Sequence, residues 1–143
     1  MATENTFAEQ VLQLLQRHRS IRKYKDRKIP DEVLDQIILS AQMASTSSHV
    51  QAYSIIGVSD PDKKRKLAEL AGQQSYVETC PYFLVFCADL KRLEYVCKRQ
   101  GADVTETLET TEKFIVATVD AALAAQNAAI AAEANGLGIV YIG

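Results

Sequence analysis

A short basic stretch near the N-terminus carries the clearest potential for chemistry in this chain. Residues 17–28 read RHRSIRKYKDRK and hold seven of the sixteen Lys and Arg residues, although the formal net charge of the chain is -2. Arg19 and Arg22 lie on either side of Ser20, a spacing that can wrap one phosphate with two guanidinium groups and a hydroxyl donor. Nucleic acid binding and a merely solvated loop are the two other interpretations, and this stretch alone leaves all three open.

A second polar stretch, residues 45–51, concentrates hydroxyl groups after a predicted helix; it consists of Ser45, Thr46, Ser47, Ser48, His49, Val50 and Gln51. Hydroxyls and backbone N–H groups in such a place can bind the heteroatoms of a polar ligand, but they also form common turns and caps. Gln74, within AGQQSYV, is a further candidate, although an amide just past a helix end is more often a surface residue. These stretches need a fold to bring them together.

Composition limits the classes of protein to which the chain can belong. With 143 residues, 48% hydrophobic and 24% charged, it has the material of one globular domain. A pI near 5.7 argues against a surface built for polyanions, so the basic cluster is local. Three cysteines indicate neither a disulfide framework nor a metal site. The first ten residues show no secretory signal and the uncharged run 121–132 is too short for a membrane span, which predicts a cytoplasmic protein.

Helix and strand patterns indicate how the polar stretches are positioned. Helices are predicted to begin at the Thr6–Glu9 capping box, at Pro30–Asp31 and at Asp60–Pro61, and another covers residues 111–135. Ten of the eighteen residues 117–134 are alanine, which lets neighbouring elements approach closely. We therefore expect this helix at the centre of the molecule or in a subunit interface.

Three apolar runs predict strands, at residues 53–58, 82–87 and 139–142. The second run lacks alternation and is expected to be covered on both faces, which implies a central sheet between helices. The third run is followed only by Gly143. Because a final strand without cover leaves an exposed edge, we expect residues 1–143 to be a single domain that is the N-terminal portion of a longer chain, or one completed by another chain.

Taken in order, several segments resemble one family. HRSIRKY, IPDEVLDQII, ASTSSHVQAYSII, LAGQQSYV, LVFCADL and AAQNAAIAAEANGLGIVYIG are similar to the N-terminal part of the oxygen-insensitive NAD(P)H nitroreductases and flavin reductases. The resemblance implies an α+β fold with three α-β-α layers, in which a central, mostly antiparallel sheet is flanked by helices and is incomplete at the C-terminus.

The resemblance also implies which residues bind FMN. His18, Arg19, Ser20 and Arg22 correspond to the motif that holds the phosphate and ribityl chain. The serine-rich turn, matched by Ser45, Thr46, Ser47 and Ser48 with Gln51, reaches the flavin of the partner subunit across a dimer interface. Gln74 corresponds to a glutamine that contacts the FMN side chain or ring, and Tyr141, Ile142 and Gly143 to a segment against the ring. The role of His49 stays open, and no catalytic residue or metal ligand is implied.

The function implied is that of a homodimeric, FMN-dependent oxidoreductase with NADPH or NADH as co-substrate. In this family the nicotinamide gives a hydride to the flavin, which then reduces a nitroaromatic, a quinone or free flavin by two electrons. The partners are thus small molecules, with no nucleic acid and no membrane. Two alternatives are an anion- or nucleic-acid-binding module that uses residues 17–28, and another flavoprotein of the same fold, such as a dehalogenase or a flavin-degrading enzyme.

Overall fold

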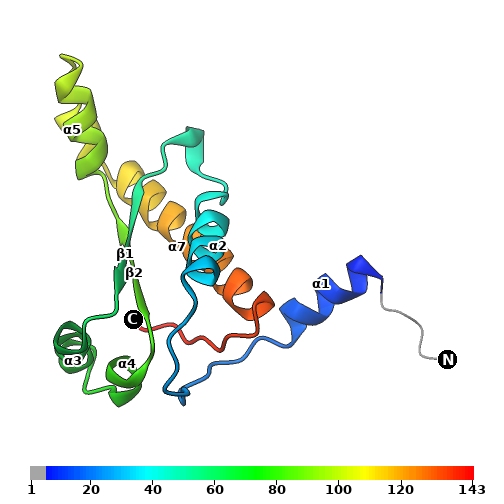
Figure 1. The fold of residues 1–143 in the computed structure, drawn as a ribbon. Coiled ribbons are helices and arrows are strands. Elements are labelled where there is room, and N and C mark those ends of the chain that lie inside the picture. Colours follow the sequence, from blue (N-terminus) through cyan, green and yellow to red (C-terminus); the bar gives the residue numbers. More distant parts are fainter. Residues whose placement is uncertain (1–5) are drawn as a thin grey trace.

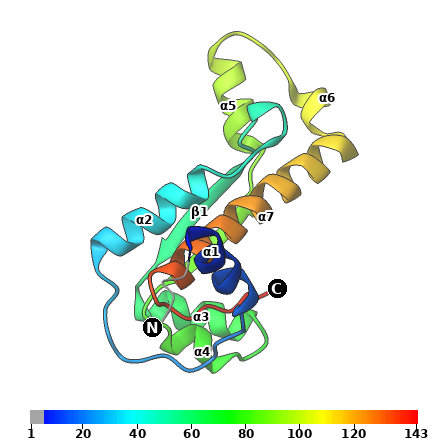
Figure 2. The same ribbon diagram turned by 90° about the vertical axis from the view of Figure 1, so that its right-hand side faces the viewer.

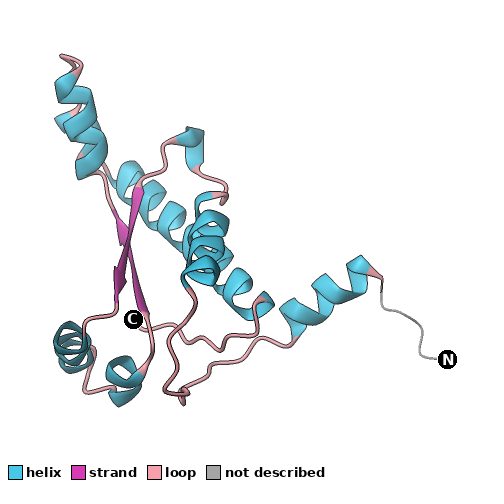
Figure 3. Ribbon diagram, in the orientation of Figure 1, coloured by secondary structure: helices cyan, strands magenta, loops and turns pink. Residues whose placement is uncertain are grey.

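The computed structural model describes residues 6–143 as helices arranged around a two-stranded antiparallel sheet (Figure 1 and Figure 3). Strand β1 (Tyr53–Val58) pairs with β2 (Phe83–Ala88), so that Tyr53 lies opposite Ala88 and Val58 opposite Phe83. Both strands are rich in β-branched and aromatic residues, which pack well on a pleated surface. The α+β class and the antiparallel pairing are confirmed.

Helix α7 (Thr111–Ala134) lies at the centre and packs against both strands and α2 (Asp31–Gln42), as Figure 2 shows. Seven of its eight buried side chains are alanines. Ala128 and Ala132 join Ile37 and Ala41 of α2 in one buried cluster, against which apolar side chains of both strands pack. Because alanine projects so little, the helix backbones approach closely and the contact area comes from their neighbours. The expected central position of this helix is confirmed.

The same helix is long and apolar enough to cross a membrane, with a mean hydropathy of 1.5 over its most apolar window. The uncharged run at residues 121–132 did not predict a helix of this length and hydropathy. A buried carboxylate, that of Asp120, lies in the middle of the helix, and its alanines pack on α2 and the sheet. Both features are those of the core helix of a folded domain, which passes the same test of length and composition.

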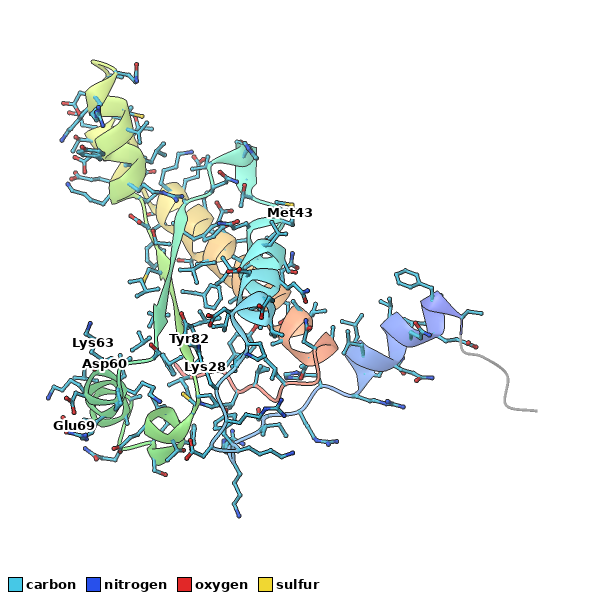
Figure 4. All side chains as sticks on the ribbon, viewed as in Figure 1. Lys28, Met43, Asp60, Lys63, Glu69 and Tyr82 are labelled. Atoms are coloured by element: carbon cyan, nitrogen blue, oxygen red, sulfur yellow. The ribbon has the colours of Figure 1, made fainter. Side chains whose placement is uncertain are left out.

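Two other helices begin where local side-chain caps predict. In α1 (Phe7–Gln16), Thr6 N donates to Glu9 Oε2 at 2.7 Å and Glu9 N donates to Thr6 Oγ1 at 3.3 Å, which completes the capping box. In α3 (Pro61–Leu70), the Asp60 carboxylate accepts a hydrogen bond from Lys63 N at 2.8 Å; Figure 4 labels both residues. Helix α1 buries no residue and projects from the rest of the chain (Figure 1).

Three short helices were not predicted: α4 (Ser75–Thr79), α5 (Lys91–Arg99) and α6 (Thr105–Leu108). Five of the nine residues of α5 are charged, so its composition gives little apolar signal, although Leu93, Val96 and Cys97 share one face. Its stability comes partly from Glu94, whose carboxylate pairs with Lys91 and, at 2.5 Å, with Lys98 on the same helix. The helix stands at the far end of the molecule from α3 and α4 (Figure 1).

The predicted strand at residues 139–142 is wrong. Within the described chain this segment is irregular, and its one backbone hydrogen bond runs from Ile21 N to Ile139 O at 2.8 Å. A strand needs a row of backbone partners, and the basic segment offers a single one. The cover of β2 is also less complete than expected, since residues 83–87 are only half-buried. The absence of a secretory signal was predicted partly from residues 1–5, which lie outside the described residues.

Candidate cofactor site

The basic segment, residues 17–28, runs as irregular backbone between α1 and α2 (Figure 1). Its backbone bonds to the rest of the chain through Ile21 N, which donates to Ile139 O at 2.8 Å, and Tyr24 Oη closes a local bond to Ile21 O at 2.7 Å. The residues predicted to bind phosphate are all exposed, namely His18, Arg19, Ser20 and Arg22. The backbone is thus anchored at Ile21 while the donors around it face solvent.

Neither guanidinium group of the motif is neutralised by a carboxylate. In the described part of the chain Arg19 makes no ion pair, and Arg22 lies over the ring of Tyr76, 5.9 Å from its centre. A cation held by an aromatic face keeps its N–H donors for an anion. The cluster Arg19, Ser20 and Arg22 therefore offers hydrogen-bond donors and positive charge without a competing negative partner.

His18 is the member of the motif that already has a charged neighbour. Its Nδ1 lies 2.9 Å from Oε1 of Glu133, near the C-terminal end of α7. Because a carboxylate only accepts hydrogen bonds, Nδ1 carries the proton, which leaves Nε2 for a ligand. This pair fixes the orientation of the imidazole and ties the basic segment to the central helix.

Gln74 lies in the connection between α3 and α4, where its side chain is engaged locally. Its Nε2 donates to Ala71 O, and its Oε1 accepts from the hydroxyl of Tyr76. Tyr76 in turn carries Arg22 over its ring, so this connection and the basic segment are neighbours. Each of these two atoms keeps a second hydrogen-bonding position, and the assignment of Gln74 to the ligand stays a prediction.

A groove of about 980 Å³ lies between the basic segment, β2 and the alanine face of α7. Its lining includes the aromatic residues Tyr24, Tyr76, Phe86 and Tyr141, together with Ile142. Tyr141 donates a hydrogen bond to Gln126 Oε1 at 3.3 Å. Burial, and next the negative charge of Glu133, raise the pKa of Tyr141, so this hydroxyl remains a donor at neutral pH. Ile21, Tyr141 and Ile142 thus bring two of the predicted stretches to the groove. The other predicted residues do not line it, namely His18, Arg19, Ser20, Arg22, Gln74 and the exposed Gly143.

The serine-rich turn, residues 45–51, lies elsewhere, between α2 and β1; Figure 4 labels Met43 just before it. Ser47 N and Ala52 N each donate to the carboxylate of Asp120 at 3.0 Å. Asp120 precedes Glu133 by more than three helical turns of α7, a separation of about 20 Å at 1.5 Å per residue. One copy of the chain therefore does not bring Ser45, Thr46, Ser47, Ser48 and Gln51 to the basic segment.

Sequence reasoning missed several residues that organise these stretches, above all Asp120 and Glu133 of α7. A signal for Asp120 was present, because it is the only charged residue between Lys113 and Glu133. It also has the spacing of the buried alanines Ala117, Ala121 and Ala124 on the same helix. A lone charge in a buried alanine face indicates a polar partner from another element.

Comparison with known proteins identifies the family. The model of the Nitroreductase family matches residues 15–143. The chain is 59% identical to an FMN reductase (NADPH) of Bacillus subtilis (strain 168), over 88% of this chain and 51% of that protein. It is 44% identical to a Cr(VI) reductase of Pseudomonas sp. (strain G-1), over 93% of this chain and 54% of that protein.

Solved structures show the same fold. The structure of B. megaterium NfrA1 has a TM-score of 0.91 and 54% identity, covering 94% of this chain and 54% of that one. NADPH:FMN oxidoreductase from Vibrio harveyi, complexed with NAD+, has a TM-score of 0.83 and 41% identity, covering 93% and 55%. The chain spans about half the length of the curated relatives it matches. Sequence, fold and family match agree, and the chain belongs to the nitroreductase family.

Proposed function

We propose that the protein is an FMN-dependent NAD(P)H oxidoreductase that reduces nitroaromatics, quinones or free flavin. The observation that carries this proposal is the pair of arginines Arg19 and Arg22 on either side of Ser20. Both are exposed, and neither has a carboxylate partner among the described residues. They lie beside a groove that Tyr141 helps to line. Membership of the nitroreductase family supports it, as do relatives named for FMN and NADPH.

The donor set fits the phosphate of FMN. Arg19, Arg22 and Ser20 present N–H and O–H donors and two positive charges, which suits a dianion and excludes a cation. With its Nδ1 donating to Glu133, His18 offers Nε2 as an acceptor, which suits a hydroxyl of the ribityl chain rather than the phosphate. These residues bind and orient the cofactor; when bound, the flavin supplies the two-electron chemistry. No described side chain is assigned a proton transfer, because water can supply the proton.

The remaining predicted residues would orient the ring. The segment Tyr141, Ile142 and Gly143 reaches the basic segment through the hydrogen bond at Ile139, and Gln74 reaches it through Tyr76 and Arg22. A flat ring system gains most from apolar walls with a few fixed polar groups, which is the composition of this groove.

We also propose a cytoplasmic homodimer in which the serine-rich turn serves the flavin of the partner subunit. The distance between that turn and the basic segment supports this arrangement. A further support is an exposed apolar surface on the first half of α7, where Phe114, Ile115, Val119 and Leu123 are between 42% and 66% exposed. Such a surface on a core helix is typical of a subunit interface.

The test uses the full-length protein. It is expected to be yellow, with a flavin spectrum that bleaches on addition of NADPH or NADH. Arg19→Ala and Arg22→Ala are each expected to weaken FMN binding by about 1.5 to 3 kcal/mol, the scale of a charge-assisted hydrogen bond to phosphate. Arg17→Ala is the matched control, since Arg17 is an exposed cation of the same segment that does not line the groove, and its loss changes the net charge equally.

The alternatives make different predictions. A nucleic-acid-binding module would lose affinity for RNA steeply with salt, and Arg17→Ala would weaken it as much as Arg19→Ala does. A dehalogenase or flavin-degrading enzyme would bind FMN but leave nitroaromatics and quinones unreduced. Unchanged FMN affinity in both arginine variants, or a full-length protein that takes up no FMN, would contradict the proposed function.

A further inference from the structure

A buried carboxylate in the middle of α7 has no assigned role. The side chain of Asp120 is 0% exposed, and no Lys, Arg or His nitrogen of residues 6–143 lies within ion-pairing distance of it. Both of its oxygens are nevertheless engaged: Oδ1 accepts from Ser47 N and Oδ2 from Ala52 N, each at 3.0 Å. Burying a charge is costly unless it is hydrogen-bonded, so these two bonds account for the presence of the group.

The two donors lie at either end of the strained part of the serine-rich turn. Between them Ser48, His49 and Gln51 have φ values of 50°, 55° and 51°, a left-handed conformation that non-glycine residues adopt rarely. Inside the turn, backbone hydrogen bonds run from Val50 N to Ser47 O at 2.9 Å and from His49 N to Thr46 O at 3.4 Å, and Arg92 of α5 donates to Gln51 O. The carboxylate joins both ends, and thereby holds a backbone that its own residues disfavour.

The chemistry of the two contacts requires a carboxylate. Each partner is an N–H donor, so both side-chain atoms must be acceptors. Asparagine has nearly the same shape but would place an amide NH₂ against one of the two N–H groups. Alanine would leave the N–H of buried Ala52 without a partner.

We propose that Asp120 is a positioning residue, which holds the turn in the conformation that presents Ser45, Thr46, Ser47, Ser48 and Gln51 to the flavin. This inference rests on the proposed function. Asp120 itself touches no ligand and acts only through the backbone of the turn. Its role is thus distinct from that of the exposed cations, which bind directly.

The first test compares Asp120→Asn with Asn127→Ala in the full-length protein. Asn127 is the control because it lies on the same helix, is partly buried and donates to a backbone carbonyl, that of Ser40, away from the turn. Asp120→Asn is expected to weaken FMN binding by about tenfold to a hundredfold, the effect of losing a hydrogen bond to a charged group. Amide hydrogen exchange should rise in residues 45–52 while that of α2 stays unchanged, and the visible circular dichroism of bound FMN should change.

Wild-type FMN affinity and exchange in Asp120→Asn would overturn the inference, as would an equal loss of affinity in Asn127→Ala.

If Asp120→Asn does not fold, a comparison of Ser47→Pro with Ser47→Ala tests the inference instead. Both remove the hydroxyl, but only proline removes the N–H that Asp120 binds, at the first residue of a 3₁₀ turn where proline is tolerated. Ser47→Pro should bind FMN about tenfold more weakly than Ser47→Ala, and equal binding would refute the role. A wild-type protein without FMN affinity would instead overturn the proposed function itself.

Discussion

In the basic segment, residues 17–28, exposed cations are carried on a backbone that is anchored mainly at Ile21 and Tyr24. The serine-rich turn, residues 45–51, contains no Lys or Arg, yet its backbone is held at both ends by a buried carboxylate. The first region thus depends on the type and spacing of neighbouring residues. The second depends on a residue of α7 far away in the sequence.

This difference follows from what each region is proposed to bind. Charge attracts a phosphate over several ångströms, so a segment of arginines needs little rigidity to find one. Hydroxyl and N–H donors act only at hydrogen-bond distance and must be held in place beforehand. We infer that the backbone is held rigidly where the interaction with the ligand is short-ranged, and is held less firmly where that interaction is long-ranged.

The largest expected effect comes from removing the anchor of the turn. Asp120→Ala should lower the free energy of unfolding by about 2 to 4 kcal/mol, because the buried N–H of Ala52 and the N–H of Ser47 lose their acceptor. Arg19→Ala, in the basic segment, should change stability by less than about 0.5 kcal/mol, since the residue is exposed and unpaired within the described chain. Urea denaturation of the full-length proteins measures both values, and equal losses would remove the distinction between the regions.

The next largest effect is expected from ionic strength, which should change the contribution of the basic segment to FMN binding but not that of the turn. Raising ionic strength from about 0.05 to 0.5 M should weaken FMN binding by about tenfold, because the charges of the basic segment are exposed and therefore screened. The slope of affinity against salt should be smaller in Arg22→Ala and unchanged in Asp120→Asn. Fluorescence titration with FMN provides the measurement. An Asp120→Asn slope as small as that of Arg22→Ala would show that the turn also acts through charge.

A smaller effect is expected at the contact between the basic segment and residues 137–143. A Cβ added at Gly138 would lie 2.8 Å from the side chain of Ile21, so Gly138→Ala forces that side chain to move. Overpacking of this kind costs about 1 kcal/mol, and the hydrogen bond from Ile21 N to Ile139 O should weaken. Hydrogen exchange should accelerate at the Ile21 amide and stay constant at the Ser47 amide. Equal acceleration at both amides would mean that the two regions are coupled.

The smallest effect concerns α5, which lies outside both regions and depends on ion pairs. Hydrogen bonds from Lys91 and then Lys98 lower the pKa of Glu94 to about 2. Because the pKa in the folded protein is below the usual value of about 4.3, the stabilisation is present above that value and is lost as the pH falls through about 2. The protection of the α5 amides, measured as exchange relative to an unstructured peptide at the same pH, should therefore fall between pH 5 and pH 2. Glu94→Gln should show the lower protection already at pH 7, and protection that does not change with pH in the wild type would contradict the role of the ion pairs.

Local features of the fold were predictable from sequence because their causes are local. The capping box of Thr6 and Glu9 and the cap at Asp60 involve residues three apart, so the helix starts follow from the residue types. The basic segment was likewise recognisable from composition alone. The strand expected at residues 139–142 shows the limit of this reasoning, since an apolar run does not reveal whether a partner strand lies beside it.

The candidate site was only partly predictable, because its side chains are oriented by distant residues. The bonds from Asp120 to the turn span 73 and 68 residues, and His18 pairs with Glu133 across 115. Gln74 was chosen by its type, yet its orientation depends on Ala71 and Tyr76. Residue type indicated which groups could bind a ligand, and packing decided which of them are available.

The alanine face of α7 has a consequence for how this protein can vary. At the two buried alanines that do not line the groove, Ala117 and Ala124, every replacement except glycine adds atoms to a contact that has no spare room. Substitutions at these positions therefore almost always introduce larger side chains, which fit only if the neighbouring backbones move apart. Libraries of variants of this protein would gain by leaving these positions constant and varying the exposed segments around them.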